Sequence, residues 1–266
     1  LSLGDGYLLL STELGGKVIG LSTEGKHGRN LFFTHPRLLD SGFLDEETNF
    51  LNPGGDRCWI APSAQFNFDR DGKLRIPKSI DPGNYEFTAI NKTSATMSNR
   101  FRVESLEGHS YDLQLVREIE MLPRLPGINV DLGFAGYRCR NRLINRSTQV
   151  IGDELPHVTL KTYLEIPPPG EILVPITQYG KENTVYNNYK DASQVEISDG
   201  MFRIKVDGGD DGLRQKLGFF PDVVTGGYAF IRDLSSEFSM AIIRIVPVYP
   251  KGEYVLENAD PTDAVR

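Results

Sequence analysis

A short glycine-rich segment places a carboxylate, a guanidinium and the single tryptophan of the chain close together. It runs from Pro53 to Pro62 and contains Asp56, Arg57 and Trp59. The glycines before Asp56 permit a tight turn or a close approach to a ligand. Asp and Arg side chains hydrogen-bond sugar hydroxyls, and an indole covers the apolar side of a pyranose. The segment predicts a sugar site, or alternatively an Asp–Arg pair that stabilises a loop, with Trp59 in the core.

His157 is the second candidate, because it opens a stretch in which polar side chains alternate. If this stretch is a strand, His157, Thr159, Lys161 and Tyr163 share one of its faces. Histidine titrates near neutral pH, so it could exchange a proton with a sugar oxygen. The row predicts the floor of a ligand site. The alternative is a histidine that makes only a structural hydrogen bond.

Lys216 stands directly before the apolar run Leu217–Phe220, from which it could reach a site as a fixed cation. The preceding loop, Asp207–Gly212, alternates Asp and Gly but lacks the final acidic ligand of a calcium loop. A solvated turn is the favoured interpretation of that loop. We predict no metal and no cofactor.

Cys58 and Cys139 do not belong to a CxxC motif, and with four scattered histidines they give no zinc spacing. One disulfide and two free thiols both stay open, and the absence of a Cys-rich framework favours free thiols. A row of Arg138, Arg140 and Arg142 falls on one face of a predicted strand, Tyr137–Ile144. This row predicts either a solvated sheet face or a cationic floor under an acidic sugar or another anion.

Strands with a two-residue period must position these side chains. Apolar residues alternate or dominate in the following segments: Val116–Met121, Ile128–Phe134, Tyr137–Ile144, Met201–Val206 and Ser239–Val248. Pro247 predicts that the last of these ends there or lies at a sheet edge. Clusters of Gly, Pro, Asn and Asp separate the strands, and no helical stripe persists over three turns. The pattern predicts an all-β, antiparallel fold.

Length and charge narrow the functional classes. The chain has 266 residues and a net charge of −7, with a pI of about 5.2. That surface charge repels phosphate backbones and anionic lipid, so we expect no nucleic-acid partner. No apolar run reaches the roughly 18 residues that span a bilayer, so we expect no membrane insertion. The compartment stays open, with secreted and periplasmic locations both compatible with a soluble chain, and the oligomeric state is undetermined.

Several short motifs together resemble galactose mutarotase (aldose 1-epimerase)-like proteins. Leu9–Leu21 followed by Gly28–Phe33 resembles their opening strands, and Gly54–Pro62 is similar to a Gly-Gly-(Asp/His)-Arg-x-Trp-x-x-Pro motif in poorly characterised branches. Leu143–Ser147 looks like the strand end that precedes the catalytic-histidine strand, and Lys216-Leu-Gly also matches those branches. The motifs cover most of the chain and follow the order of that superfamily.

The resemblance implies one antiparallel β-supersandwich domain over residues 1–266, truncated at its C-terminus relative to those branches, with a carbohydrate cleft. In mutarotases a histidine protonates the ring oxygen while a glutamate near the C-terminus takes the anomeric proton. His157 matches the acid, and Glu257, or else Glu253, is left as the base. The resemblance places Asp56, Arg57, Trp59 and Lys216 around the substrate.

Three hypotheses for the function remain open. An aldose epimerase-type isomerase is favoured, and a non-catalytic glycan-binding module would use the same cleft without an acid–base pair. The third is a polysaccharide lyase or hydrolase domain, in which Tyr163 is the base and Arg138, Arg140 or Lys216 neutralises a uronate carboxylate. All three take a carbohydrate ligand.

Overall fold

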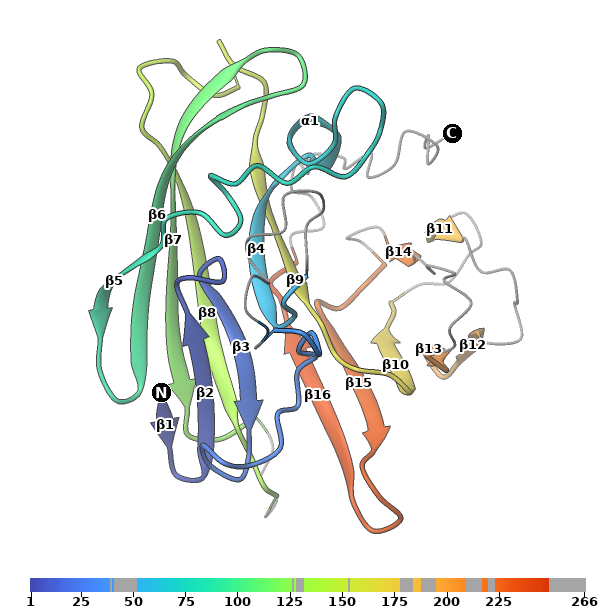
Figure 1. Cartoon of the computed structure of the whole chain (residues 1–266). Helices are drawn as coiled ribbons and strands as arrows, with labels where there is room; N and C mark the ends of the chain where they lie inside the picture. The colour runs from blue at the N-terminus through green and yellow to red at the C-terminus, as the bar shows by residue number, and fades with distance from the viewer. Residues whose placement is uncertain are drawn as a thin grey trace. The chain divides into compact units, whose positions relative to one another are not determined.

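The computed structural model describes residues 1–38, 40, 52–125, 127, 132–152, 154–177, 184–187, 195–208, 217–219 and 223–248 (Figure 1). The chain forms two compact units, unit 1 built on Leu1–Ile166 and unit 2 on Pro167–Tyr254. The single domain expected over residues 1–266 stays a prediction.

Two antiparallel sheets form unit 1. The first has five strands in the order β1-β2-β3-β4-β9, and the second has four in the order β5-β6-β7-β8. The strands of the first sheet are β1 (Ser2–Leu3), β2 (Gly6–Ser11), β3 (Lys17–Ser22), β4 (Asp56–Ala61) and β9 (Thr159–Leu164). Those of the second are β5 (Glu86–Ile90), β6 (Ser94–Glu104), β7 (Ser110–Leu122) and β8 (Gly136–Asn145). Figure 1 shows the long strands β6, β7 and β8 side by side in green.

Apolar side chains fill the space between the two sheets of unit 1. Leu8, Val18 and Ile60 of the first sheet are fully buried, as are Leu113 and Leu115 of β7. On β7 the odd-numbered positions are buried while most even-numbered ones are not, which is the alternation of a strand with one face on a core. The predicted strands Val116–Met121 and Tyr137–Ile144 are confirmed as parts of β7 and β8.

Unit 2 contains a five-stranded antiparallel sheet in the order β12-β13-β10-β15-β16 and a two-stranded sheet of β11 and β14. The strands are β10 (Gly170–Pro175), β11 (Thr184–Asn187), β12 (Val195–Ser198), β13 (Met201–Val206), β14 (Leu217–Phe219), β15 (Gly227–Asp233) and β16 (Ser239–Ile245). Its core joins Val174 and Ile176 to Phe202, Ile204 and Val223.

Two strand predictions for unit 2 are confirmed and one prediction for unit 1 is not. Met201–Val206 is β13, and the apolar run from Ser239 forms β16, which ends at Ile245 just before Pro247. The predicted strand Ile128–Phe134 fails where it can be checked, because 132–134 are not in a strand and 128–131 lie outside the described residues.

The described residues are thus almost entirely β, with a single short helix, α1 (Ser63–Phe66). The all-β antiparallel fold predicted from the two-residue period is confirmed. The specific supersandwich remains a prediction. In the described parts of the chain no helix is long and apolar enough to span a membrane.

Candidate functional site

Strand β4 carries the Asp-Arg-Cys-Trp sequence and is buried along its whole length. It pairs with β9 so that Arg57 lies opposite Tyr163, and Trp59 opposite Lys161. Directly opposed residues of an antiparallel pair share a face of the sheet. These four side chains therefore lie on one face of β4 and β9, while Asp56 lies on the other.

A stack of cationic and aromatic groups occupies the first face. The guanidinium carbon of Arg57 lies 4.5 Å from the ring centroid of Trp59 and 4.7 Å from that of Tyr163. The two rings meet edge to face at 5.1 Å, and the ammonium of Lys161 lies 4.9 Å from the Tyr163 centroid. A desolvated cation–π contact contributes about 1–2 kcal/mol, so the stack fixes the plane of Arg57.

Glu165, directly after β9, completes this group. Arg57 donates from Nη1 to Asn52 Oδ1 at 2.7 Å and forms an ion pair with Glu165. Asn52 donates from Nδ2 to the other carboxylate oxygen of Glu165. The Glu165 side chain is 20% exposed against 8% for Arg57, so the carboxylate is the part of the pair that meets solvent.

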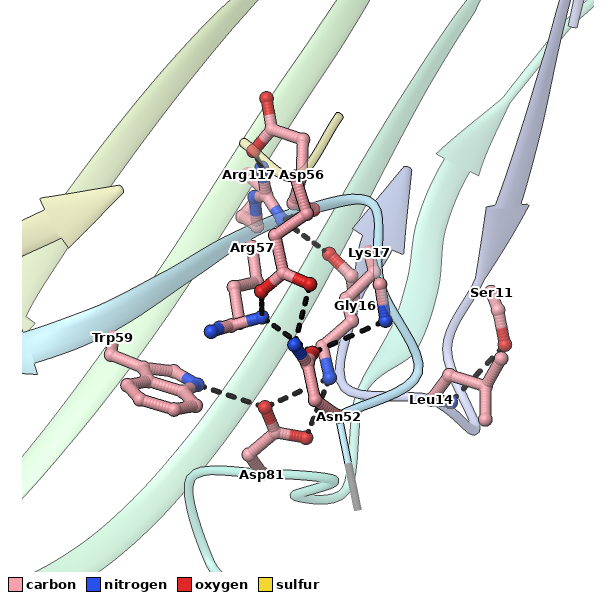
Figure 2. Close-up of polar contacts among 12 residues, drawn as sticks. Ser11, Leu14, Gly16, Lys17, Asn52, Asp56, Arg57, Trp59, Asp81 and Arg117 are labelled. Atoms are coloured by element: carbon pink, nitrogen blue, oxygen red, sulfur yellow. Dashed lines mark hydrogen bonds and ion pairs between the residues drawn. The ribbon is translucent and has the colours of Figure 1, made fainter. Parts of the chain in front are cut away.

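Asp81 joins the same face from the loop before β5 (Figure 2). Its carboxylate accepts from the Trp59 indole Nε1 at 2.8 Å and forms an ion pair with Lys17 Nζ at 2.9 Å. Both charged side chains are buried, at 0% and 5% exposure. Burial lowers the pKa of Lys17, and the negative charge of Asp81 opposes that shift. We call Lys17, Asn52, Arg57, Trp59, Asp81, Lys161, Tyr163 and Glu165 the aromatic–ionic network.

The opposite face of β4 carries a second group, the intersheet network of Asp56, Arg117, Tyr137 and Asn141. Arg117 of β7 is fully buried and donates from Nη2 to Asp56 Oδ1 at 2.8 Å. It also donates from Nη1 to the Gly16 carbonyl at 2.7 Å (Figure 2). Its Nε donates to Asn141 Oδ1 at 3.0 Å. Tyr137 of β8 donates to Asp56 Oδ2 at 2.7 Å. The network ties β4 to β7 and β8 of the facing sheet.

The structure corrects the predicted joint role of Asp56 and Arg57. Neighbouring residues on a strand point to opposite faces, so the two side chains cannot hold one ligand together. Nor do they form the alternative loop pair, since Asp56 pairs with Arg117 and Arg57 pairs with Glu165. Trp59 is 4% exposed, which matches its interpretation as a core residue, and its indole offers no open face for a sugar.

The glycines before Asp56 were predicted to permit a tight turn or a close approach to a ligand, and Gly55 in fact permits a close approach to β3. Gly55 has φ +77°, and a Cβ there would collide with the carbonyl oxygen of Val18 on β3. Gly55 also accepts from the Glu165 amide and donates to the Phe33 carbonyl. The close approach it permits is to the neighbouring strand of the same sheet.

His157 lies apart from the Arg57–Glu165 pair. It is exposed, precedes β9, and sits beside Gly152 in the loop after β8. Thr159 to Glu165 spans about 20 Å at the rise of an extended strand, so one pyranose cannot touch both His157 and Glu165. The predicted floor residues Lys161 and Tyr163 do lie together on one face, half-buried. Glu253, Glu257 and Lys216 lie outside the described residues.

Sequence reasoning missed Glu165, Asp81 and Arg117. Glu165 continues the alternation that begins at His157, so extending the pattern by one step would have found it. Arg117 occupies the apolar register of β7, between the buried Leu115 and Ile119, and a charge at such a position signals a buried partner. Asp81 stands in a Pro-Gly turn, and no sequence signal ties it to Trp59.

Cys58 and Cys139 are free thiols, as favoured from the sequence. Cys58 is buried, and Cys139 is half-buried with its sulfur 3.5 Å from Arg117 Nη2. Among the described residues no group of His, Cys, Asp and Glu could hold a metal ion.

The fold and these networks define an all-β protein with two polar networks on opposite faces of one buried strand. The chain belongs to a family of unknown function, DUF6786, whose profile matches residues 2–262. Neither a comparison with curated proteins nor one with solved structures gives a match. The family assignment supports no activity, so the chemistry of the two networks carries the functional interpretation.

Two tyrosines beside these networks predict a loss of stability in alkali. Burial raises the pKa of Tyr85, and burial together with the charge of Asp56 raises the pKa of Tyr137. A group whose pKa is higher when folded contributes stability below its unfolded pKa of about 10, and that stability is lost as the pH rises further. We expect urea stability to fall above about pH 10, by up to about 1.4 kcal/mol per pH unit for each tyrosine.

Tyr85→Phe separates this effect from ordinary packing. Within the described part of the chain the buried Tyr85 hydroxyl makes no well-formed hydrogen bond, and the weak contact with Asn99 only opposes the rise of its pKa. Its removal is therefore expected to be neutral or to stabilise by about 1 kcal/mol. Tyr137→Phe, which loses the bond to Asp56, should instead cost about 1.5–3 kcal/mol. An unchanged alkaline slope in Tyr85→Phe would contradict the assignment.

Proposed function

We propose that this protein binds a mono- or oligosaccharide at the aromatic–ionic network on β4 and β9. The proposal depends on one observation, the packing of Arg57 against the rings of Trp59 and Tyr163 beside the partly exposed carboxylate of Glu165. Sugar sites combine an aromatic surface for the C–H face of the ring with fixed polar groups for its hydroxyls. The network contains both kinds of group at neighbouring positions.

Tyr163 takes the stacking role in this proposal, because it is half-buried whereas Trp59 is almost fully covered. Glu165 accepts hydrogen bonds from sugar hydroxyls through the lone pairs that Arg57 and Asn52 leave open. Arg57 and Trp59 hold Tyr163 and Glu165 in place and do not touch the sugar. Such support keeps the binding groups in one geometry before the ligand arrives.

Replacement of Tyr163 by alanine is expected to weaken sugar binding at least tenfold, because it removes the half-buried ring on which the sugar is proposed to stack. Glu165→Gln, which keeps the shape but removes the charge, should weaken binding less and change the order of preference among sugars. Saturation-transfer NMR identifies a ligand from neutral aldoses and their short oligosaccharides, and calorimetry then gives the affinity. Phe87→Ala removes a ring that is 39% exposed on β5 and is the matched control. The proposal fails if no sugar in the panel binds, or if Tyr163→Ala binds like the unsubstituted chain.

Aldose epimerase chemistry, which the resemblance to mutarotases implies, is a separate proposal for a sugar bound at His157, apart from Tyr163 and Glu165. We expect His157→Ala to abolish anomer interconversion, measured by polarimetry, while sugar binding persists. A fully active His157→Ala variant would overturn the role of His157. Since His157 and Glu165 are too far apart to share a pyranose, Glu257 stays the proposed base.

A non-catalytic glycan-binding module is the second candidate. Of the two carboxylates in the aromatic–ionic network, only Glu165 is partly exposed. Arg57 and Asn52 already bind it, which favours sugar binding over proton transfer. Sugar binding without polarimetric activity would support the module. A lyase with Tyr163 as base would instead release product with a new double bond and its ultraviolet absorbance.

A further inference from the structure

The outward face of β6, β7 and β8 carries many arginines, and we call it the arginine face. Strand pairing puts alternate residues of the three strands on it, opposite to the buried face. Its arginines are Arg100, Arg102, Arg138, Arg140 and Arg142, with Arg146 just beyond β8. Its carboxylates are Glu104, Asp112, Glu118 and Glu120. All of these residues lie in the described part of the chain, and lysine is absent from this face.

At one end of the face, the predicted arginine row of β8 meets two glutamates of β7. Arg138 lies 3.5 Å from Glu120, while Glu118 is shared between Arg140 at 3.5 Å and Arg142 at 2.7 Å. The three arginine side chains are 54–67% exposed. The row is therefore solvated and partly balanced, and two carboxylates face three guanidinium groups.

At the other end, Asp112 stands among three arginines, and Glu104 follows Arg102 on the same face of β6. Arg100 Nη2 pairs with Asp112 at 2.8 Å. The hydrogen bond from Arg100 is the main cause that lowers the pKa of Asp112, and the charges of Arg102 and Arg146 lower it further. Arg102 donates to Ser110 Oγ at 2.8 Å, and Arg146 to Gln114 Oε1 at 2.9 Å from Nε. Both of these guanidinium groups thus bond neutral oxygens.

Over the whole face six arginines stand against four carboxylates, or five when Glu86 of β5 is included. This excess stands on a chain whose net charge is −7. Exposed ion pairs contribute little to stability. The carboxylates of a ligand can therefore replace those of the protein as ion-pair partners of these arginines. Arginine binds a carboxylate through two parallel hydrogen bonds, which a lysine cannot do.

We propose that the arginine face binds an acidic polysaccharide, a linear chain with regularly spaced carboxylates such as a polyuronate. Successive outward arginines on one strand are about 7 Å apart, and the rows of β6 and β8 are about 10 Å apart. The excess charge is thus confined to an area that a few sugar residues can cover. A nucleic acid fits less well, because the outward positions of these three strands carry no aromatic side chain for base stacking.

The test measures binding of a short oligogalacturonate to the full chain by fluorescence anisotropy at low and at physiological ionic strength. The triple variant Arg138→Ser, Arg140→Ser, Arg142→Ser is expected to bind at least tenfold more weakly. Glu118→Gln, which removes a competing carboxylate from Arg140 and Arg142, is expected to bind a few-fold more tightly. A gain in affinity is not what damage to the fold would produce.

The charge-matched control replaces three exposed cations of unit 1 elsewhere in the chain, Arg70, Lys73 and Arg75, by serine. It should leave oligogalacturonate binding unchanged, and circular dichroism checks that both triple variants fold. Unchanged binding in the β8 variant, or equal loss in the control, would overturn the proposal. Equal or tighter binding of a DNA duplex of the same charge would overturn the assignment to a polysaccharide. Tyr163→Ala should retain oligogalacturonate binding, which separates this face from the sugar site on β4 and β9.

Discussion

Arg117→Met is expected to destabilise unit 1 by about 3–5 kcal/mol, because it leaves the carboxylate of Asp56 buried without its cation. The same change removes the donors that Gly16 and Asn141 accept from. Urea unfolding followed by tryptophan fluorescence measures the effect, since Trp59 is the only tryptophan and lies on β4 beside Asp56. The expected result is a large fall in the midpoint of unfolding.

Two further variants test whether the buried charge is the cause. Arg140→Met removes an arginine whose side chain is 67% exposed and pairs with Glu118, and it should change stability by no more than about 0.5 kcal/mol. Arg117→Met combined with Asp56→Asn should recover part of the loss, because no charge is then buried unpaired. If the double variant lost the sum of both single effects, a general packing defect would explain the result better than the charge.

Gly16→Ala is expected to destabilise unit 1 by about 2–4 kcal/mol. Gly16 has φ +60°, where a Cβ costs about 1–2 kcal/mol, and the added carbon would collide with the ring of Tyr85. The ring is buried at 8% exposure and cannot move freely, so overpacking adds about 1–3 kcal/mol. The Gly16 carbonyl also accepts from Arg117, so a shift of this turn would reach the intersheet network.

Gly4→Ala is the matched control for this prediction. Gly4 has nearly the same φ, +57°, but nothing lies within 4 Å of an added Cβ. It should therefore show the backbone cost alone. Equal losses in Gly4→Ala and Gly16→Ala would mean that the contact with Tyr85 contributes nothing.

The two-residue period predicted β7, β8 and β13 because each has one face on a core and one face toward solvent, and a mostly apolar run predicted β16. It failed for β4, where all six residues are buried on both faces. The sequence Asp-Arg-Cys-Trp-Ile-Ala therefore shows no alternation and looked like a loop after two glycines. A strand with polar residues at buried positions cannot be predicted from hydrophobic alternation alone.

The candidate site was predicted in part for the same reason. Arg57, Trp59, Lys161 and Tyr163 were all named from the sequence, in two separate segments. Their junction depends on the pairing of β4 with β9, about a hundred residues later, and local patterns carry no information on such pairing. Asp56 was placed with Arg57 because the two are adjacent, whereas a strand separates neighbours.

The two networks on β4 also bear on the order of events during folding. Asp56 pairs with Arg117, which lies 61 residues later in the sequence. Arg57 pairs with Glu165, which lies 108 residues later. Contacts of such long sequence separation require the entropy of large loops to be lost first, and chains rich in them fold slowly. During synthesis β4 leaves the ribosome with its charges unmatched, and it stays so until the strand that ends before Glu165 has emerged. Unit 1 is therefore expected to fold in one late step, after β9 has been synthesised, around β4, which is synthesised early.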